Sequence, residues 1–162
     1  MTRFQTVLVA TDGTNDSDGA IEAALDLAHD TGAKLLVLTV VPEGTTEEGA
    51  SDGDDDHHRR SSSRDEDEEI TEAQERTNSV LDHATEWGLE AQSIIWEGDP
   101  GETIIAAAEA EGADLIVVGT TGRGGVGRML MGSTSDFVIR NAMVPVLVVR
   151  SPRDIERERE RE

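Results

Sequence analysis

The feature that most constrains the fold of this chain is an alternation between short apolar runs and segments with helical spacing. Five runs are expected to form strands, at residues 4–10, 34–41, 89–97, 114–119 and 144–150. Between them, apolar side chains recur at helical spacing within residues 16–31, from near 68 to 87, after Pro100 and within 133–141. Strands that alternate with helices predict parallel crossovers. The fold class is therefore α/β, with one doubly wound, Rossmann-like, five-stranded parallel sheet and helices on both faces.

The composition agrees with such a sheet. Hydrophobic residues make up 36% of the 162-residue chain and aromatic residues only 2%, so the core must consist of valine, isoleucine, leucine and alanine. A parallel sheet that is covered on both faces uses aliphatic residues of this kind. The length suits a single domain, which we expect at residues 1–152, followed by a charged tail at 153–162.

An acidic insertion at residues 43–69 interrupts the pattern. It is rich in Asp, Glu, Ser and Gly and has no apolar period. We expect it to be a disordered loop, because nothing in it offsets the entropy lost on ordering. Two alternatives remain open. His57 and His58 beside the aspartates at 54–56 are a possible metal site, and the serines at 61–63 beside arginines are possible phosphorylation sites.

Three of the expected strands end at positions that favour ligand binding. Asp12, Val40 and Gly119 all lie at the carboxyl ends of expected strands. In open α/β sheets, ligands bind beyond the carboxyl ends of the strands, where the strand order reverses. The three positions therefore predict a common site.

An anion-binding pattern follows the fourth expected strand, in the segment GTTGRGGVGRMLMGSTS at residues 119–135. The segment carries Arg123 and Arg128 and no acidic residue, although the chain has a formal net charge of −21. Glycines let backbone N–H groups approach phosphate oxygens, and the helix expected to start at Ser133 adds N–H donors and a positive dipole end. The alternative is an ordinary glycine-rich crossover in which Ser133 only caps the helix.

Two familiar nucleotide-binding motifs do not explain this segment. The chain contains no GxxxxGK[ST] sequence, which excludes a P-loop NTPase. Residues 122–127 fit GxGxxG, but they follow the fourth strand rather than the first. The acidic partner expected about 20 residues later falls among apolar residues at 146–149. We interpret that match as accidental.

The spacing Gly119-x2-Gly122-x9-Gly132-Ser133 resembles the G-x2-G-x9-G-[ST] signature of the universal stress protein family, in its ATP-binding subgroup. The resemblance covers nearly all of residues 4–150, including the ends of the first two strands and the closing run 144–149. It implies an adenine nucleotide that lies across the carboxyl ends of the first and fourth strands.

The resemblance also implies a role for each part of the site. Asp12 would bind near the ribose, and the backbone at Val40 would meet the adenine. Gly119 and Gly122 would pack along the ribose and phosphates, while the first turn of the following helix would hold the phosphates. The full set of expected nucleotide-binding residues is Ala10, Thr11, Asp12, Val40, Val118, Gly119, Thr121, Gly122, Arg123, Gly132, Ser133, Thr134 and Ser135.

Asp12 has other interpretations as well. It can cap the helix that follows or stabilise the turn without touching a ligand. It can also help to hold Mg²⁺ on the phosphates of ATP, but one carboxylate does not make a metal site. We therefore assign no metal ligand with certainty and no catalytic residue.

Three functions remain open at this point. The first is a regulatory, stress-related protein that binds ATP, with or without Mg²⁺. The second is a slow ATPase or self-phosphorylating enzyme that uses Ser133 or Ser135, and the third is a nucleotide-free dimeric interaction module. We favour the first, because no nucleophile–base arrangement indicates fast chemistry. The resemblance also implies a homodimer through residues 145–150, whose apolar edge would otherwise invite aggregation.

The charge balance limits the classes of binding partner, and other sequence features indicate the cellular compartment. With 35 acidic and 14 basic residues, the surface repels the phosphates of nucleic acids and anionic membranes. The chain has no cysteine, no apolar run near 20 residues and no stretch typical of a signal peptide, so we expect a cytoplasmic protein. The acidity has two interpretations, an ordinary acidic protein or a halophilic adaptation to a salt-rich cytoplasm, and we favour the second.

Halophilic adaptation predicts that the protein is more stable in molar KCl than in dilute buffer. Salt shortens the Debye length from about 30 Å at 0.01 M to about 3 Å at 1 M, so it screens the repulsion between crowded carboxylates. Thermal melts in the two buffers at one pH measure the effect, and we expect Tm to rise by roughly 5 °C or more. Equal Tm values would rule the adaptation out.

Overall fold

The computed structural model describes residues 3–12, 17–43, 62–120, 132–150 and 159–160 of the chain. Strands and helices alternate along these residues, as the sequence predicts. In chain order they are β1 (Thr6–Thr11), α1 (Asp18–Thr31), β2 (Lys34–Val41), α2 (Ser62–Glu86), β3 (Ala91–Glu97), α3 (Pro100–Glu111), β4 (Leu115–Gly119), α4 (Ser133–Asn141) and β5 (Val146–Val149).

The five strands form one sheet in the order β3-β2-β1-β4-β5, and the four pairings are all parallel. The chain therefore builds outward from β1 to β3 on one side, then returns to place β4 and β5 on the other side. This confirms the doubly wound sheet, and it places the reversal of strand order between β1 and β4. The more polar strand β3 lies at an edge, as its composition predicts.

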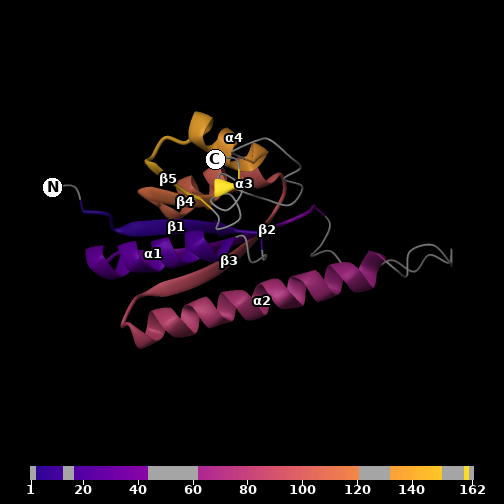
Figure 1. The fold of residues 1–162 in the computed structure, drawn as a ribbon, viewed down its shortest axis with the longest axis horizontal. Helices are drawn as coiled ribbons and strands as arrows, with labels where there is room; N and C mark the ends of the chain where they lie inside the picture. Colours follow the sequence, from indigo (N-terminus) through magenta and orange to yellow (C-terminus); the bar gives the residue numbers. More distant parts are fainter. Residues whose placement is uncertain (1–2, 13–16, 44–61, 121–131, 151–158, 161–162) are drawn as a thin grey trace.

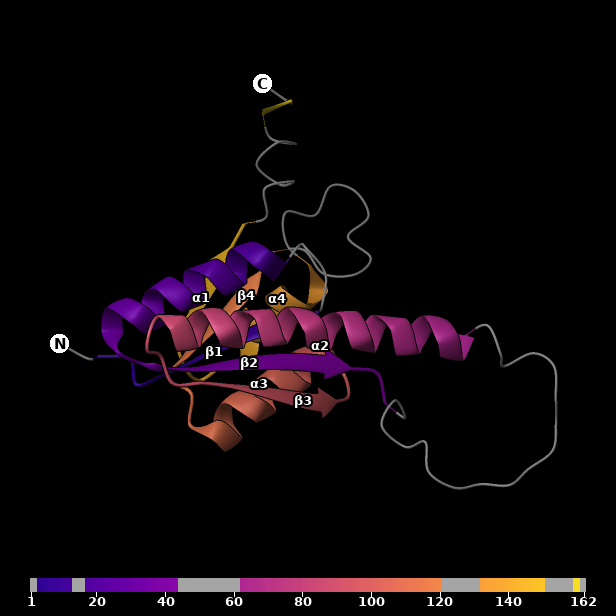
Figure 2. The same cartoon turned by 90° about the horizontal axis from the view of Figure 1, so that it is seen from below.

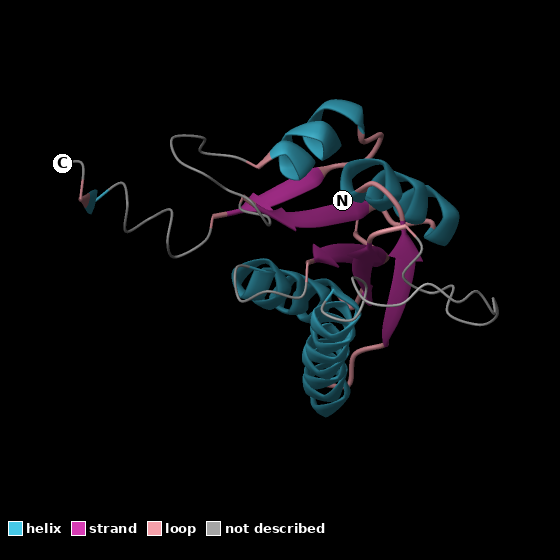
Figure 3. Ribbon diagram, turned by 90° about the vertical axis from the view of Figure 1, so that its right-hand side faces the viewer, coloured by secondary structure: helices cyan, strands magenta, loops and turns pink. Residues whose placement is uncertain are grey.

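Helices cover both faces of the sheet, so the molecule has three layers (Figure 1). Figure 3 shows the strands twisting between the helical layers. Because side chains alternate along a strand, each face has its own buried cluster. Beneath α1 and α2 lie Val7, Val9, Leu35, Val37, Leu115 and Val117. Beneath α3 and α4 lie Leu8, Leu36, Leu38, Ile116 and Val118. Aliphatic side chains fill both clusters, as the composition requires.

The carboxylate of Asp114 aligns the two central strands at the amino edge of the sheet. Its Oδ2 accepts a hydrogen bond from the N–H of Gln5 at 2.8 Å, and its Oδ1 accepts one from the N–H of Thr6 at 3.0 Å. The backbone N–H of Asp114 donates in turn to the carbonyl of Thr6. These bonds join the start of β1 to the start of β4 and fix their register.

The helix ends follow local chemistry that can be recognised in the sequence. The side chain of Asp99 accepts a hydrogen bond from the N–H of Glu102 and so caps α3, while Pro100 occupies the first turn where no N–H is needed. Gly32 and Gly112 end α1 and α3 in the left-handed conformation, with φ of 71° and 67°.

The start of α2 corrects the predicted extent of the acidic insertion. We expected a disordered loop over residues 43–69, with helical structure from near 68, but α2 begins at Ser62. Figure 2 shows its first turns extending past the carboxyl ends of β2 and β3. Residues 44–61 of the insertion lie outside the described residues. Although α2 has 25 residues, none of the helices in the described ranges is long and apolar enough to cross a membrane.

Gly101 and Gly19 differ in the space around them, although both lie near the start of a helix. A Cβ atom added to Gly101 would lie 2.6 Å from Cδ1 and 3.1 Å from Cβ of Phe137, so α3 and α4 touch at this glycine. A Cβ atom added to Gly19 of α1 would have its nearest neighbour, Cγ1 of Val149, at 3.6 Å, which is ordinary contact. Of these two glycines, only Gly101 is required by packing.

We expect Gly101→Ala to destabilise the protein by about 1–3 kcal/mol, because the added methyl group forces α3 away from Phe137. The matched control Gly19→Ala should be neutral or stabilising by up to about 1 kcal/mol, because alanine is the better helix former. Urea unfolding of both variants measures the difference. If Gly101→Ala is as stable as Gly19→Ala, the close contact between α3 and α4 is wrong.

Candidate functional site

The carboxyl ends of β1 and β4 lie next to each other at the reversal of strand order. Val9 is registered with Val117, so continuing by two residues brings Gly119 level with Thr11. On the other side of β1, Thr11 is registered with Thr39, which brings Val40 level with Asp12. The strand ends that the sequence singles out therefore meet at one edge, which we call the carboxyl edge.

Three of the expected site residues present their side chains to the core rather than to this edge. Ala10, Val40 and Val118 all pack in the cluster beneath α3 and α4. Any ligand at the carboxyl edge would then meet them through their backbone atoms. That agrees with the backbone role expected for Val40.

Asp12 is held by Ser17, a residue that the sequence pattern did not indicate. The N–H of Asp12 donates to Oγ of Ser17 at 3.3 Å, and the Ser17 hydroxyl donates to Oδ1 of Asp12 at 2.8 Å. Ser17 is only 6% exposed and directly precedes α1. The pair ties the end of β1 to the start of α1, as the interpretation of Asp12 as a structural residue expects.

Thr120 and Gly132 bring the two ends of the glycine-rich segment together. The N–H of Gly132 donates to the carbonyl of Thr120 at 2.6 Å, and the N–H of Thr120 donates to the carbonyl of Val149 at 3.0 Å. Thr120, which has no distinctive sequence signal, is 5% exposed. These bonds place the start of α4 directly beside the ends of β4 and β5.

The N-terminus of α4 has no side-chain cap. Gly132 is the N-cap residue, and Ser133 is the first helical residue, so the interpretation of Ser133 as a mere cap is wrong. The first intrahelical bond runs from the N–H of Asp136 to the carbonyl of Gly132 at 3.1 Å. The N–H groups of Ser133 and its two successors therefore precede the helical hydrogen-bond ladder and carry the positive end of the dipole.

The hydroxyl groups in this first turn have different surroundings. Ser133 is exposed and Thr134 is half-buried, whereas Ser135 is only 3% exposed and its hydroxyl donates to the carbonyl of Gly132 at 3.0 Å. Asp136 places a carboxylate in the same turn, and Arg140 neutralises it through an ion pair of 3.0 Å. The turn therefore offers backbone donors and one exposed hydroxyl to an anion.

Other predicted residues lie elsewhere. Thr121, Gly122 and Arg123 fall outside the described residues, as do the histidines at 57–58, Ser61 and most of the tail, whereas Ser62 and Ser63 begin α2. His29 and His83 lie in the last turns of α1 and α2, at the opposite edge of the sheet. Within the described ranges, no group of three or more His, Cys, Asp and Glu side chains is placed to hold a metal ion.

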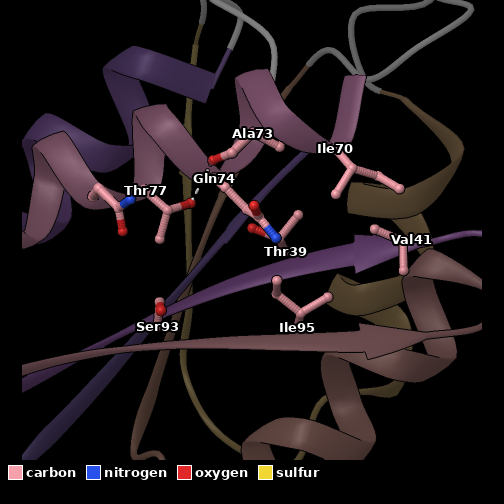
Figure 4. A pocket seen from close by; sticks show the side chains of 9 residues that line it. Thr39, Val41, Ile70, Ala73, Gln74, Thr77, Ser93 and Ile95 are labelled. Carbon is pink, nitrogen blue, oxygen red and sulfur yellow. Dashed lines mark hydrogen bonds between the residues drawn. The ribbon is translucent and has the colours of Figure 1, made fainter. Parts of the chain in front are cut away.

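A small cavity lies between α2 and the strands β2 and β3 (Figure 4). It holds about 40 Å³, far below the roughly 300–1,000 Å³ of usual ligand pockets. It is lined by Thr39 and Val41 of β2, Ser93 and Ile95 of β3, and Ile70, Ala73, Gln74, Thr77 and Asn78 of α2. It is therefore too small for a nucleotide.

The sequence matches a known protein family over most of its length. A model of the universal stress protein family matches residues 3–150, which is most of the chain. The chain belongs to the universal stress protein family. The resemblance seen in the spacing of the glycines is thus confirmed.

Relatives of this universal stress protein match it over nearly its whole length. A universal stress protein of Methanocaldococcus jannaschii is 33% identical and covers 93% of this chain and 84% of its own. One from Bacillus subtilis is 32% identical and covers 91% of this chain and 99% of its own. A solved universal stress protein in complex with cAMP is 25% identical, with a TM-score of 0.65, over 92% of this chain and 98% of that one.

Proposed function

We propose that this universal stress protein binds ATP at the carboxyl edge and acts as a regulator in the cytoplasm, through its conformation or its choice of partner. The observation that carries the proposal is the uncapped N-terminus of α4, which the bonds of Thr120 to Gly132 and to Val149 set beside the ends of β4 and β5. The cAMP complex of a relative at 25% identity supports an adenine nucleotide as the ligand class.

The phosphates would lie on the first turn of α4. Backbone N–H groups and the helix dipole favour an anion there, and the ion pair with Arg140 partly offsets the carboxylate of Asp136 in the same turn. The glycine-rich segment with Arg123 would complete the phosphate contacts. Asp12, held by Ser17, would face the ribose, and Mg²⁺ would be bound through the phosphates rather than by a protein cluster.

We expect Ser133→Asp to weaken ATP binding by about 100-fold or more, because the new carboxylate takes the place of the phosphates and repels them. The fold should remain intact, because an acidic residue in the first turn interacts favourably with the helix dipole. Calorimetric titration of ATP and AMP in molar KCl with Mg²⁺ measures affinity, and melts measure stability.

Two controls separate the effects of charge and of the hydroxyl group. Ser79→Asp adds the same charge at an exposed position of α2 and should leave ATP affinity unchanged. Ser133→Ala removes the hydroxyl but keeps the backbone donor, so the loss should be only a few-fold. Equal ATP affinity in Ser133→Asp and wild type would refute the phosphate position. Phosphate release that Gly122→Val abolishes would indicate an ATPase instead.

We also propose a homodimer through β5. This strand is an edge of the sheet, and large apolar side chains are exposed on it and on the neighbouring helix α4. Leu147 of β5 is 36% exposed, and Met143, which connects α4 to β5, is 86% exposed. An apolar edge strand of this kind pairs readily with another strand, and a second copy of the chain would cover it.

Leu147→Lys should convert the dimer to a monomer, because it places a charge in the centre of the proposed contact. Sedimentation equilibrium at micromolar concentration measures the mass. The matched control Gln92→Lys adds a charge to β3, the opposite edge, at an exposed position and should leave the mass unchanged. A wild-type protein that sediments as a monomer would disprove this interface.

A further inference from the structure

We propose that Arg76 of α2 is a positioning residue for the carboxyl edge. It holds the first turn of α1 and, through Ser17, the carboxylate of Asp12. The consequence for nucleotide affinity rests on the proposed function, whereas the coupling between α2 and Asp12 rests on the contacts of the chain alone.

Arg76 links two helices that are far apart in the sequence. Its Nη1 atom is shielded from solvent and lies 3.7 Å from Oδ1 of Asp18, the first residue of α1. The Arg76 side chain is 35% exposed and that of Asp18 is 60% exposed. A partly desolvated guanidinium interacts more strongly with a carboxylate than a fully exposed one does.

One peptide bond and one hydrogen bond connect the ion pair to Asp12. Asp18 is joined by a peptide bond to Ser17, and the Ser17 hydroxyl donates to Asp12 at 2.8 Å. The position of the Ser17 hydroxyl depends on the position of the first turn of α1. If that turn is released from α2, the bonds that hold Asp12 weaken with it.

The packing of α2 against the sheet is incomplete next to Arg76. Ala73 and Thr77, which flank Arg76 along the helix, line the cavity between α2 and the sheet (Figure 4). An incompletely filled interface forfeits dispersion contacts, so a larger share of the attachment comes from polar interactions.

The ion pair between Lys34 and Glu90 provides a matched control. Its atoms are 3.6 Å apart, and its side chains are 31% and 77% exposed, which is close to the values for Arg76 and Asp18. It lies at the amino edge of the sheet, where Lys34 begins β2. An effect that comes only from losing a surface ion pair should therefore be the same in Arg76→Gln and in Lys34→Gln.

The experiment compares Arg76→Gln, Arg76→Lys and Lys34→Gln with wild type at the lowest salt that keeps all four folded. The first measurement is the exchange rate of the Asp12 amide by NMR, which reports its bond to Ser17 without any nucleotide. The second is the Kd for ATP. For Arg76→Gln we expect faster exchange and about two- to fivefold weaker ATP binding, the range of a partly exposed ion pair. Arg76→Lys should restore both, and Lys34→Gln should change neither.

Salt distinguishes a role of the charge from a role of the side-chain stem. Raising KCl should reduce the difference between Arg76→Gln and wild type, because the pair is partly exposed to screening. Asp12 exchange that is the same in Arg76→Gln and Lys34→Gln overturns the coupling. Faster Asp12 exchange with unchanged ATP affinity overturns the positioning role. Faster exchange in a protein whose wild type binds no ATP leaves the coupling in place and refutes the proposed function instead.

Discussion

The pairing of β1 with β4 is the contact on which the rest of the structure depends. It joins segments more than 100 residues apart, and the Asp114 carboxylate fixes its register through the amides of Gln5 and Thr6. The strand order reverses there, so the helices that follow β1 and β4 leave toward opposite faces. The ends of the two strands consequently share one edge of the sheet. A shift by one residue would separate the backbone of Gly119 from Asp12 and turn the core side chains of the shifted strand to the other face.

The sequence predicts the sheet well because the strands are buried on both faces. Buried parallel strands must be continuous apolar runs, and such runs can be recognised without any neighbour. The start of α2 was not predicted, for the opposite reason. Its first turns extend past the sheet, so they have no apolar face, and only their helix-forming Glu and Arg residues favour a helix. Apolar periodicity detects the part of a helix that packs on the sheet, and it does not detect turns that extend past the sheet.

The candidate site was predicted only in part, and the missed residues share a cause. The positions of Asp12 and Gly119 follow from strand ends, and the start of α4 follows from glycine and serine spacing. Ser17 and Thr120 act through single hydrogen bonds. The Ser17 hydroxyl donates to the Asp12 carboxylate, and the Thr120 carbonyl accepts from the N–H of Gly132. Such contacts need one residue in one place and produce no repeating pattern. Ser17 lies inside the segment that was expected to be helical, but it is the residue before α1, and its side chain bonds to Asp12 rather than capping α1.

The proposed function requires an anion to approach a chain with a net charge of −21. Long-range attraction is unable to achieve this, because the field of the whole protein repels a nucleotide. Hydrogen-bond donors at short range must attract the nucleotide instead. The backbone N–H groups at the start of α4 are suited to this role, because salt screens distant charges much more than it weakens direct hydrogen bonds. The same salt reduces the repulsion from the surrounding carboxylates. A protein with an acidic surface can therefore bind an anion at an uncapped helix N-terminus, provided that the ionic strength is high.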